Sequence, residues 1–138
     1  MIRIVAAGLF ISLAGILPAH ALSCEANFQV EGTPLLTALN FRTSEILPRV
    51  DSNRALNQLR AAMLAEGFIN VSMDRSAGAL TAFQETTGSG RPQTLRVSAR
   101  KSGSGTRVDA VFMIQAGQVA DATLIRGYLC RIVAAGKD

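Results

Sequence analysis

The chain lacks most of the side chains on which common catalytic sites depend. Its 138 residues include no tryptophan, only two lysines and a single histidine. That histidine, His20, lies in an apolar N-terminal segment, so the rest of the chain cannot hold a serine–histidine or cysteine–histidine pair or a histidine-containing zinc site. No Gly-x-Ser-x-Gly, P-loop or dinucleotide-binding pattern is present. We therefore expect a protein that is not an enzyme and has no cofactor and no metal.

Three carboxylates remain as candidates for acid–base catalysis: Glu66, Asp74 and Glu85. Their spacing pairs none of them with another, so we interpret them as solvated surface groups. A hydrolase that uses these carboxylates is accordingly the weakest of the functions considered.

The first 21 residues have the pattern of a secretory signal peptide. Arg3 precedes an uncharged apolar run over 4–17, and Ala19-His20-Ala21 then gives the small-x-small pattern of a cleavage site. This predicts cleavage after Ala21 and a periplasmic or secreted protein. The alternative is an uncleaved membrane anchor, but the run is shorter than the roughly 18 residues of a typical span.

The chain carries 14 basic and 10 acidic residues, a formal net charge of +4. A mildly basic surface suits anionic components of a cell envelope, such as an acidic protein or anionic lipid. No platform of aromatic and basic residues is visible, so a nucleic acid is not an expected partner.

Two segments have the periodicity of amphipathic helices. Asp51 can cap the first, which ends near Gly67, and Asp121 can cap the second over Ala122–Ala135. The first helix carries an apolar stripe of Leu56, Leu59, Met63 and Leu64. The stripe of the second consists of Leu124, Ile125, Tyr128, Leu129 and Ile132.

Five further segments alternate between apolar and polar residues, as half-buried strands do. They fall within 35–47, 68–75, 79–86, 94–101 and 107–115. In the second of them, Ile69, Val71 and Met73 are expected on one side. Phe28 and Val30 also alternate, which leaves a short edge strand open as an option near the N-terminus.

This order of elements predicts an α+β fold with the sequence β-α-β-β-β-β-α. We expect a four- to five-stranded antiparallel sheet with both helices packed on one face, because each helix has a single apolar side to bury. Residues 22–34 would form a lead-in and residues 35–138 a single domain. The expected core includes Leu56, Leu59, Met63, Val97, Phe112, Leu124, Leu129 and Ile132.

The two cysteines, Cys24 and Cys130, predict a disulfide, because an even count in an exported protein is typical of one. Helical geometry puts Cys130 opposite the apolar stripe of its helix, pointing away from the sheet, so the lead-in must cross that helix or run beside it. The alternative is lipidation of Cys24, since Ala21-Leu22-Ser23-Cys24 loosely resembles a lipobox. That would make the chain an outer-membrane lipoprotein and leave Cys130 unpaired. Membrane contact is otherwise expected to be peripheral at most.

Arginines gather on one predicted sheet face. Arg96 and Arg100 share a side of one strand, and Arg107 lies on the same side of the next, together with Val111 and Met113. One interpretation is a solvated outer face that discourages aggregation. The other is a binding surface for an anionic partner, which the apolar residues among the arginines favour.

Several motifs of the chain recur in one family. They are Ala55-Leu56-x-x-Leu59, the helix end Ala65-Glu66-Gly67-Phe68, the hairpin Asp74-Arg75-x-Ala77-Gly78-Ala79-Leu80-Thr81-Ala82, and Thr106-Arg107-Val108 after a Gly-Ser turn. Through them, residues 47–135 resemble small bacterial envelope proteins, many of them lipoproteins, that include BamC-like helix-grip domains. The resemblance implies a helix-grip, TBP-like fold and an accessory or scaffold role, and it transfers no catalytic residue. The weak lipobox departs from the family's usual membrane anchor.

Two functions follow from these observations. The first is a non-enzymatic periplasmic or envelope protein that binds or scaffolds another component. The alternative is a carrier of a small apolar ligand or lipid, held between the helices and the sheet.

Overall fold

The computed structural model describes residues 22–85 and 90–138. The predicted signal peptide and its cleavage site therefore lie outside the described residues. The elements are β1 (Gln29–Glu31), β2 (Leu39–Leu47), α1 (Ser52–Ala65), β3 (Ile69–Asp74), β4 (Ala79–Glu85), β5 (Pro92–Ser102), β6 (Gly105–Ile114) and α2 (Ala122–Ala135).

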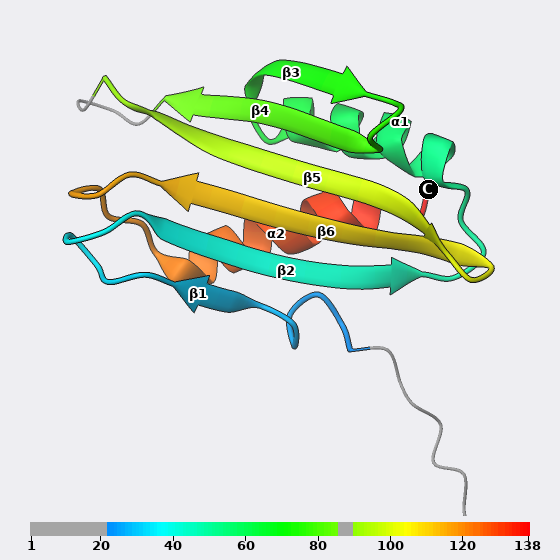
Figure 1. Ribbon diagram of the computed structural model, residues 1–138, viewed down its shortest axis with the longest axis horizontal. Coiled ribbons are helices and arrows are strands. Elements are labelled where there is room, and N and C mark those ends of the chain that lie inside the picture. Colours follow the sequence, from blue (N-terminus) through cyan, green and yellow to red (C-terminus); the bar gives the residue numbers. More distant parts are fainter. Residues whose placement is uncertain (1–21, 86–89) are drawn as a thin grey trace, which may run out of the picture.

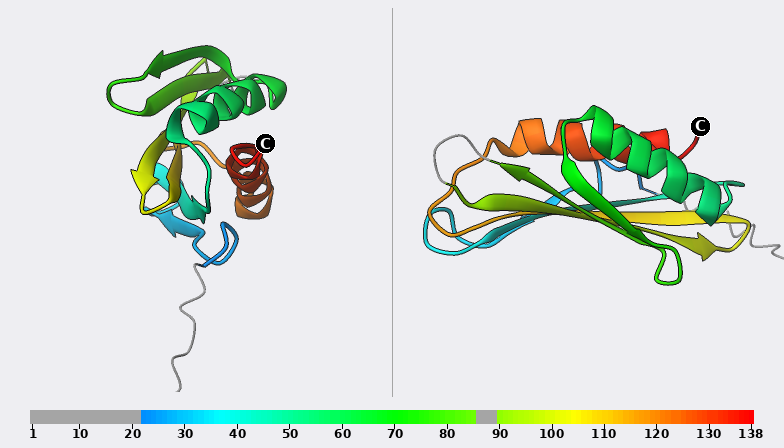
Figure 2. Two further views of the ribbon diagram at one scale, coloured as in Figure 1. Left: turned by 90° about the vertical axis from the view of Figure 1, so that its right-hand side faces the viewer. Right: turned by 90° about the horizontal axis from the view of Figure 1, so that it is seen from above.

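The strands form one antiparallel sheet in the order β1-β2-β6-β5-β4-β3. Both helices lie against the same face, so the molecule has two layers and the other sheet face is open (Figures 1 and 2). α1 packs mainly on β5, β3 and β4, whereas α2 packs on β2, β6 and α1. The α+β class and the placement of both helices on one face are as predicted.

The sheet has six strands rather than the predicted four to five. The additional strand is β1, which comes from the lead-in and pairs with β2 along the register Val30↔Phe41. Phe28 precedes it, and its ring stacks on that of Phe41 at 6.4 Å. The short edge strand that the alternation of Phe28 and Val30 left open is therefore present, at Gln29–Glu31. Local alternation cannot identify its partner, β2, which lies about ten residues further along the chain.

Both helices begin at the predicted caps. The Asp51 carboxylate accepts a hydrogen bond from the backbone N–H of Arg54, and that of Asp121 accepts from Thr123 and Leu124. Such bonds satisfy backbone donors that have no partner within the helix. α1 ends at a left-handed Gly67 (φ +90°), where the N–H of Phe68 reaches back to the carbonyl of Met63.

The core lies between the helices and the sheet. Seven of the eight expected core residues are buried there: Leu56, Leu59, Met63, Val97, Phe112, Leu129 and Ile132. Leu124 is the exception, with 60% of its surface exposed, and Leu64 of the first predicted stripe is also 47% exposed. These two assignments were wrong because each lies at the margin of its helix's apolar arc, where the neighbouring elements decide what is covered.

A bulge interrupts β3. Ser72 lies opposite Thr81, but Ile69 lies opposite Phe83, so one extra residue is inserted between them. Asn70 adopts a left-handed conformation there (φ +51°). The bulge turns Ile69 to the open face, whereas strict alternation had placed it with Val71 and Met73, which pack against the core.

Candidate binding surface on the open sheet face

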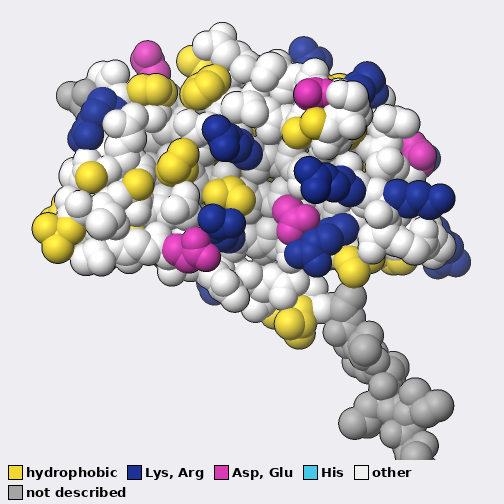
Figure 3. Space-filling view, in the orientation of Figure 1, with side chains coloured by type: hydrophobic (Ala, Val, Ile, Leu, Met, Phe, Trp, Pro, Cys, Tyr) yellow, Lys and Arg dark blue, Asp and Glu magenta, His cyan; other side chains and the backbone are white. Residues whose placement is uncertain are grey.

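The side of the sheet that faces away from the helices, here called the open face, carries alternate residues of every strand. Its centre is formed by β5, β6 and β2. The central residues are Thr94, Arg96, Ser98, Arg100, Arg107, Asp109, Val111, Met113, Asn40, Arg42, Ser44 and Ile46. Figure 3 views this face and shows basic side chains spread across it, with acidic and apolar ones between them.

The structure brings the five residues predicted from the sequence to this face. Arg96 lies directly opposite Val111, and Arg100 directly opposite Arg107. Met113 is opposite Thr94, and it lies two residues after Val111 on the same side of β6. Val111 and Met113 are half-buried while the three arginines are exposed. The geometric part of the prediction therefore corresponds to a real, contiguous surface.

Carboxylates neutralise two of the arginines on this face. Arg107 donates to both oxygens of Asp109, with Nε–Oδ2 at 3.0 Å and Nη2–Oδ1 at 2.9 Å. This carboxylate raises the pKa of Arg107 above its ordinary value, mainly through the hydrogen bonds and secondarily through its charge. Arg42 in turn forms an ion pair with Glu31, Nε–Oε2 2.9 Å.

Arg96 and Arg100 have no carboxylate partner among residues 22–85 and 90–138. Arg100 also lies directly across from another arginine, an arrangement that disfavours the folded state unless a counter-charge relieves it. Asp109 relieves the repulsion on the Arg107 side only. The uncompensated positive charge of the open face is therefore concentrated at Arg96 and Arg100.

The sequence analysis missed the contribution of β2 and β1. Arg42 lies opposite Val111, on the far side from Arg96, so two arginines flank one apolar residue. A hollow of about 300 Å³ beside them is lined in part by Gln29, Arg42, Arg107 and Val111. Alternation with buried Phe41 and Thr43 places Arg42 on the outer side of its own strand. It does not show that β6, which carries Val111, is the neighbouring strand.

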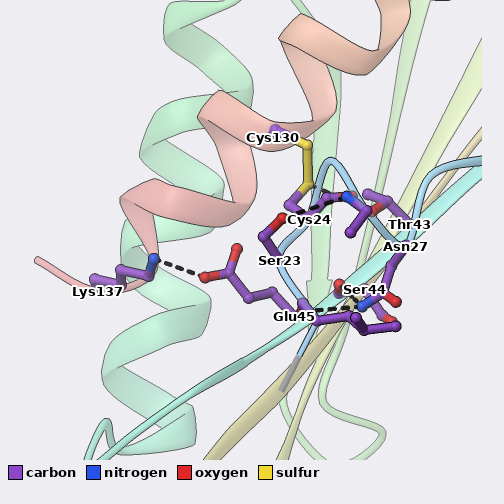
Figure 4. The surroundings of a disulfide bond; sticks show 10 residues. Ser23, Cys24, Asn27, Thr43, Ser44, Glu45, Cys130 and Lys137 are labelled. Atoms are coloured by element: carbon purple, nitrogen blue, oxygen red, sulfur yellow. Dashed lines mark hydrogen bonds and ion pairs between the residues drawn. A yellow bond between two sulfur atoms is a disulfide. The ribbon is translucent and has the colours of Figure 1, made fainter. Parts of the chain in front are cut away.

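The predicted disulfide between Cys24 and Cys130 is present, with their Cα atoms 5.6 Å apart. Figure 4 shows the lead-in passing between α2 and β2, where the Thr43 hydroxyl donates to the Cys24 carbonyl. Asn27 Nδ2 adds a bond to the Ser44 carbonyl at 2.8 Å. These contacts fasten the lead-in to the sheet as well as to the helix.

The predicted orientation of Cys130 was wrong. It does not lie on an outer surface away from the sheet: Cys130 is only 7% exposed and Cys24 1%, and both belong to the core. The buried arc of α2 includes Val133, because the helix is contacted by α1, the sheet and the lead-in together. Because these contacts come from several sides, the buried surface of α2 includes Cys130 and Val133 and excludes Leu124.

Exposed apolar side chains gather at one end of the molecule. Leu35, Leu36 and Val119 are 58%, 78% and 72% exposed. Their two loops are joined by a hydrogen bond from the Gly117 N–H to the Leu35 carbonyl, 3.0 Å. Leu35 has a left-handed backbone (φ +66°), which is unfavourable for a bulky side chain.

The candidate acid–base groups are not assembled into a site. Glu66 is held by Arg131, whose hydrogen bonds lower the pKa of the carboxyl below its ordinary value. Asp74 accepts from the Ser76 hydroxyl and the Ala77 N–H, and these bonds lower its pKa as well. Glu85 lies at the far end of β4, away from the turn that follows Asp74. A lowered pKa is the reverse of what a general acid at neutral pH requires.

Within the part of the chain that the structure describes, no cluster of three or more histidine, cysteine or carboxylate residues could hold a metal ion. None of the described helices is long and apolar enough to cross a membrane.

No protein-family model matches the chain, and a search of curated proteins finds no relative.

Proposed function

We propose that this chain is a non-enzymatic binding or scaffold component of the bacterial cell envelope, and that it binds an anionic partner through the open face. We further propose that its fold is of the helix-grip kind, as in the BamC-like domains that its motifs resemble. The observation that carries the proposal is the pair of uncompensated arginines, Arg96 and Arg100, beside half-buried Val111 and Met113. Charged donors around a partly apolar surface are suited to an anionic ligand with some apolar area.

The buried disulfide between Cys24 and Cys130 supports a protein that matures under oxidising conditions. Cys24 is engaged in that bond, which supports the disulfide over lipidation at this residue. Together with the N-terminal leader pattern, this favours the periplasm or the exterior of the cell.

The alternative function, carriage of a small apolar ligand between the helices and the sheet, requires space in that layer. In the described residues, close-packed side chains occupy it: Phe41, Leu59, Met63, Leu95 and Ile132 are each at most 1% exposed. A ligand could enter only by displacing them, at the cost of well-packed contacts. This observation favours binding on the open face.

Vesicle binding tests the proposal. Sedimentation with phosphatidylglycerol vesicles, and binding to polyglutamate as a soluble acidic polymer, would be measured for the parent and for Arg96→Ser/Arg100→Ser. Each basic residue near an anionic membrane contributes about 1 kcal/mol, so the double variant should partition roughly 20- to 30-fold more weakly into the vesicles.

The matched control is Arg60→Ser/Arg126→Ser, which removes the same charge from exposed positions on the two helices. It should retain most of the binding, and phosphatidylcholine vesicles should bind none of the proteins. Equal losses in the two double variants would show that only net charge matters. Unchanged binding of Arg96→Ser/Arg100→Ser would contradict the proposal and show that the open face is only a solvated surface.

A further inference from the structure

A second basic site lies at the end of the sheet where α1 begins, the β3–β4 turn folds back and β5 ends (Figure 1). These segments enclose a hollow of about 260 Å³. Three of its lining residues are basic: Arg75, Arg100 and Lys101. Ser52, Asn53 and Ser76 add polar groups, whereas Leu56 and Ala99 are the larger apolar contributions. Arg100 also belongs to the open face, whereas the other lining residues do not, and binding in the hollow does not require binding at the open face.

None of the three basic side chains has a carboxylate partner within the described ranges. Arg75 is positioned by a hydrogen bond from Nη2 to Asn57 Oδ1, 2.8 Å, a neutral acceptor that leaves its positive charge uncompensated. A guanidinium has five N–H donors, so most of them remain for a ligand. Three basic residues therefore line the hollow, and no carboxylate of the described ranges neutralises them.

The carboxylates nearest in sequence are engaged elsewhere. Asp74 accepts from Ser76 Oγ at 2.7 Å and from the Ala77 N–H at 3.0 Å, inside its own turn. Asp51 accepts from the Arg54 N–H at the start of α1, and neither aspartate lines the hollow. An anion in the hollow would thus meet donors and cations on its walls.

The β3–β4 turn, which forms one wall of the hollow, is held close to the backbone of β5. The Ala99 N–H donates to the Gly78 carbonyl at 2.9 Å. Gly78 has a φ of +63°, and a Cβ there would lie 2.7 Å from the Ala99 carbonyl oxygen. Glycine is required for this approach, which also brings the turn against the side chain of Arg100. The basic groups therefore project from a supported framework.

We propose that this hollow binds a phosphomonoester, the phosphate group of a small molecule or of a lipid headgroup. Three cations suit a dianionic phosphate better than a singly charged carboxylate or phosphodiester, and arginine matches phosphate oxygens with paired donors. The volume is larger than a bare phosphate needs and leaves room for a small organic substituent. The predominantly polar walls fit such a group better than an apolar ligand.

Amide NMR titration with glycerol 3-phosphate tests the proposal, with sodium chloride at matched ionic strength as the reference. The expected result is a saturable shift confined to amides around Ser52, Ser76–Gly78 and Lys101. Arg75→Gln/Lys101→Gln should weaken binding about tenfold or more, because two of the three charge-assisted contacts are lost. Shifts spread over all arginine-bearing surfaces, or an unaltered titration in this variant, would overturn the site.

Two comparisons separate the possible sources of the ligand and the two binding surfaces. Vesicles containing phosphatidic acid, a phosphomonoester, should bind better than those containing phosphatidylglycerol if the ligand is a lipid headgroup. Binding of glycerol 3-phosphate without this preference supports a free phosphomonoester, while no binding of either monoester overturns the proposal. Arg96→Ser removes an open-face cation outside the hollow and should leave the titration unchanged, so failure of the open-face proposal is distinguishable.

Discussion

Leucines on the first helix illustrate how single residues differ in their contribution to stability. Leu59 is fully buried between α1 and the sheet, whereas Leu64, five positions further on, is 47% exposed. We expect Leu59→Ala to lower the free energy of unfolding by about 2–5 kcal/mol, through lost burial and the cavity left behind. Phe112→Ala should fall in the same range, because that ring is 2% exposed and contacts Phe41 and Phe68. Urea unfolding measures both.

Leu64→Ala is the matched control and should cost well under half as much as Leu59→Ala, since it removes a side chain that is already largely in water. Leu124→Ala provides the same comparison on α2 against buried Leu129. If the exposed and buried leucine variants unfold at the same urea concentration, the burial assignments of both helices are contradicted.

The ion pair between Glu66 and Arg131 joins the end of α1 to α2, with Nε–Oε1 at 2.7 Å. The pKa of Glu66 is lowered from its ordinary value of 4.5, so its ionised form is favoured in the folded state. Its contribution to stability is therefore fully present above about pH 4.5 and is lost as the pH falls through the lower folded-state pKa. Glu66→Gln should destabilise the protein at pH 7 and less so at pH 3.

Chemical denaturation of the parent and Glu66→Gln at the two pH values gives this difference. Glu25→Gln, which removes an exposed carboxylate that has no ion pair in the described residues, is the control. High salt should shrink the effect, since Arg131 is 58% exposed and its charge is screened. A difference that is the same at pH 7 and pH 3 would rule out this ion pair as its source.

At the scale of elements, one covalent bond joins the lead-in to α2. The disulfide closes 106 residues of chain, and the loss of unfolded-state entropy alone gives up to about 4–5 kcal/mol, with smaller values common in practice. Cys24→Ser/Cys130→Ser should therefore lower the melting temperature. It should also speed hydrogen exchange in β1 and the turn before it more than in β5 and β6.

Reduction of the parent should reproduce the double serine variant in both measurements. Thiol alkylation without reductant, on protein from an oxidising compartment, should label neither cysteine. Two freely labelled thiols would contradict the bond, and an unchanged melting temperature after complete reduction would show that it contributes little to stability.

At the scale of the whole molecule, the predicted export would determine which covalent form is made. We predict that the mature protein begins at Leu22, after cleavage behind Ala19-His20-Ala21. Intact mass of protein recovered from the envelope fraction should match residues 22–138 with the disulfide formed, and should rise on reduction by the mass of the added hydrogens. A diacylglyceryl adduct on Cys24 would contradict both the cleavage site and the disulfide.

Much of the candidate surface follows from local pattern. Alternation along β5 and β6 placed Arg96, Arg100, Arg107, Val111 and Met113 on one side, and the structure agrees. The uncompensated charge of the surface was harder to predict, because it depends on which side chains form ion pairs. Asp109 lies on the same face and compensates Arg107, which leaves less free charge than a count of arginines implies.

The sequence by itself determined the two helices, the direction of alternation in β5 and β6, and the cysteine pair. Asp51, Asp121 and Gly67 act on backbone groups within one helical turn, and alternation depends only on adjacent residues. Two cysteines in a chain admit one intramolecular pairing. Each of these features is set by interactions that are short in sequence or by simple counting.

Only the tertiary structure decided which strands are neighbours and which helix surfaces are covered. Arg42 reaches the open face beside Val111 because β2 pairs with β6, about 70 residues away along the chain. Cys130 and Val133 are buried and Leu124 is exposed because the lead-in, α1 and the sheet contact α2 from different sides. The basic hollow likewise exists because the β3–β4 turn docks on β5. Such contacts join remote segments, and their free energy depends on how the whole core packs.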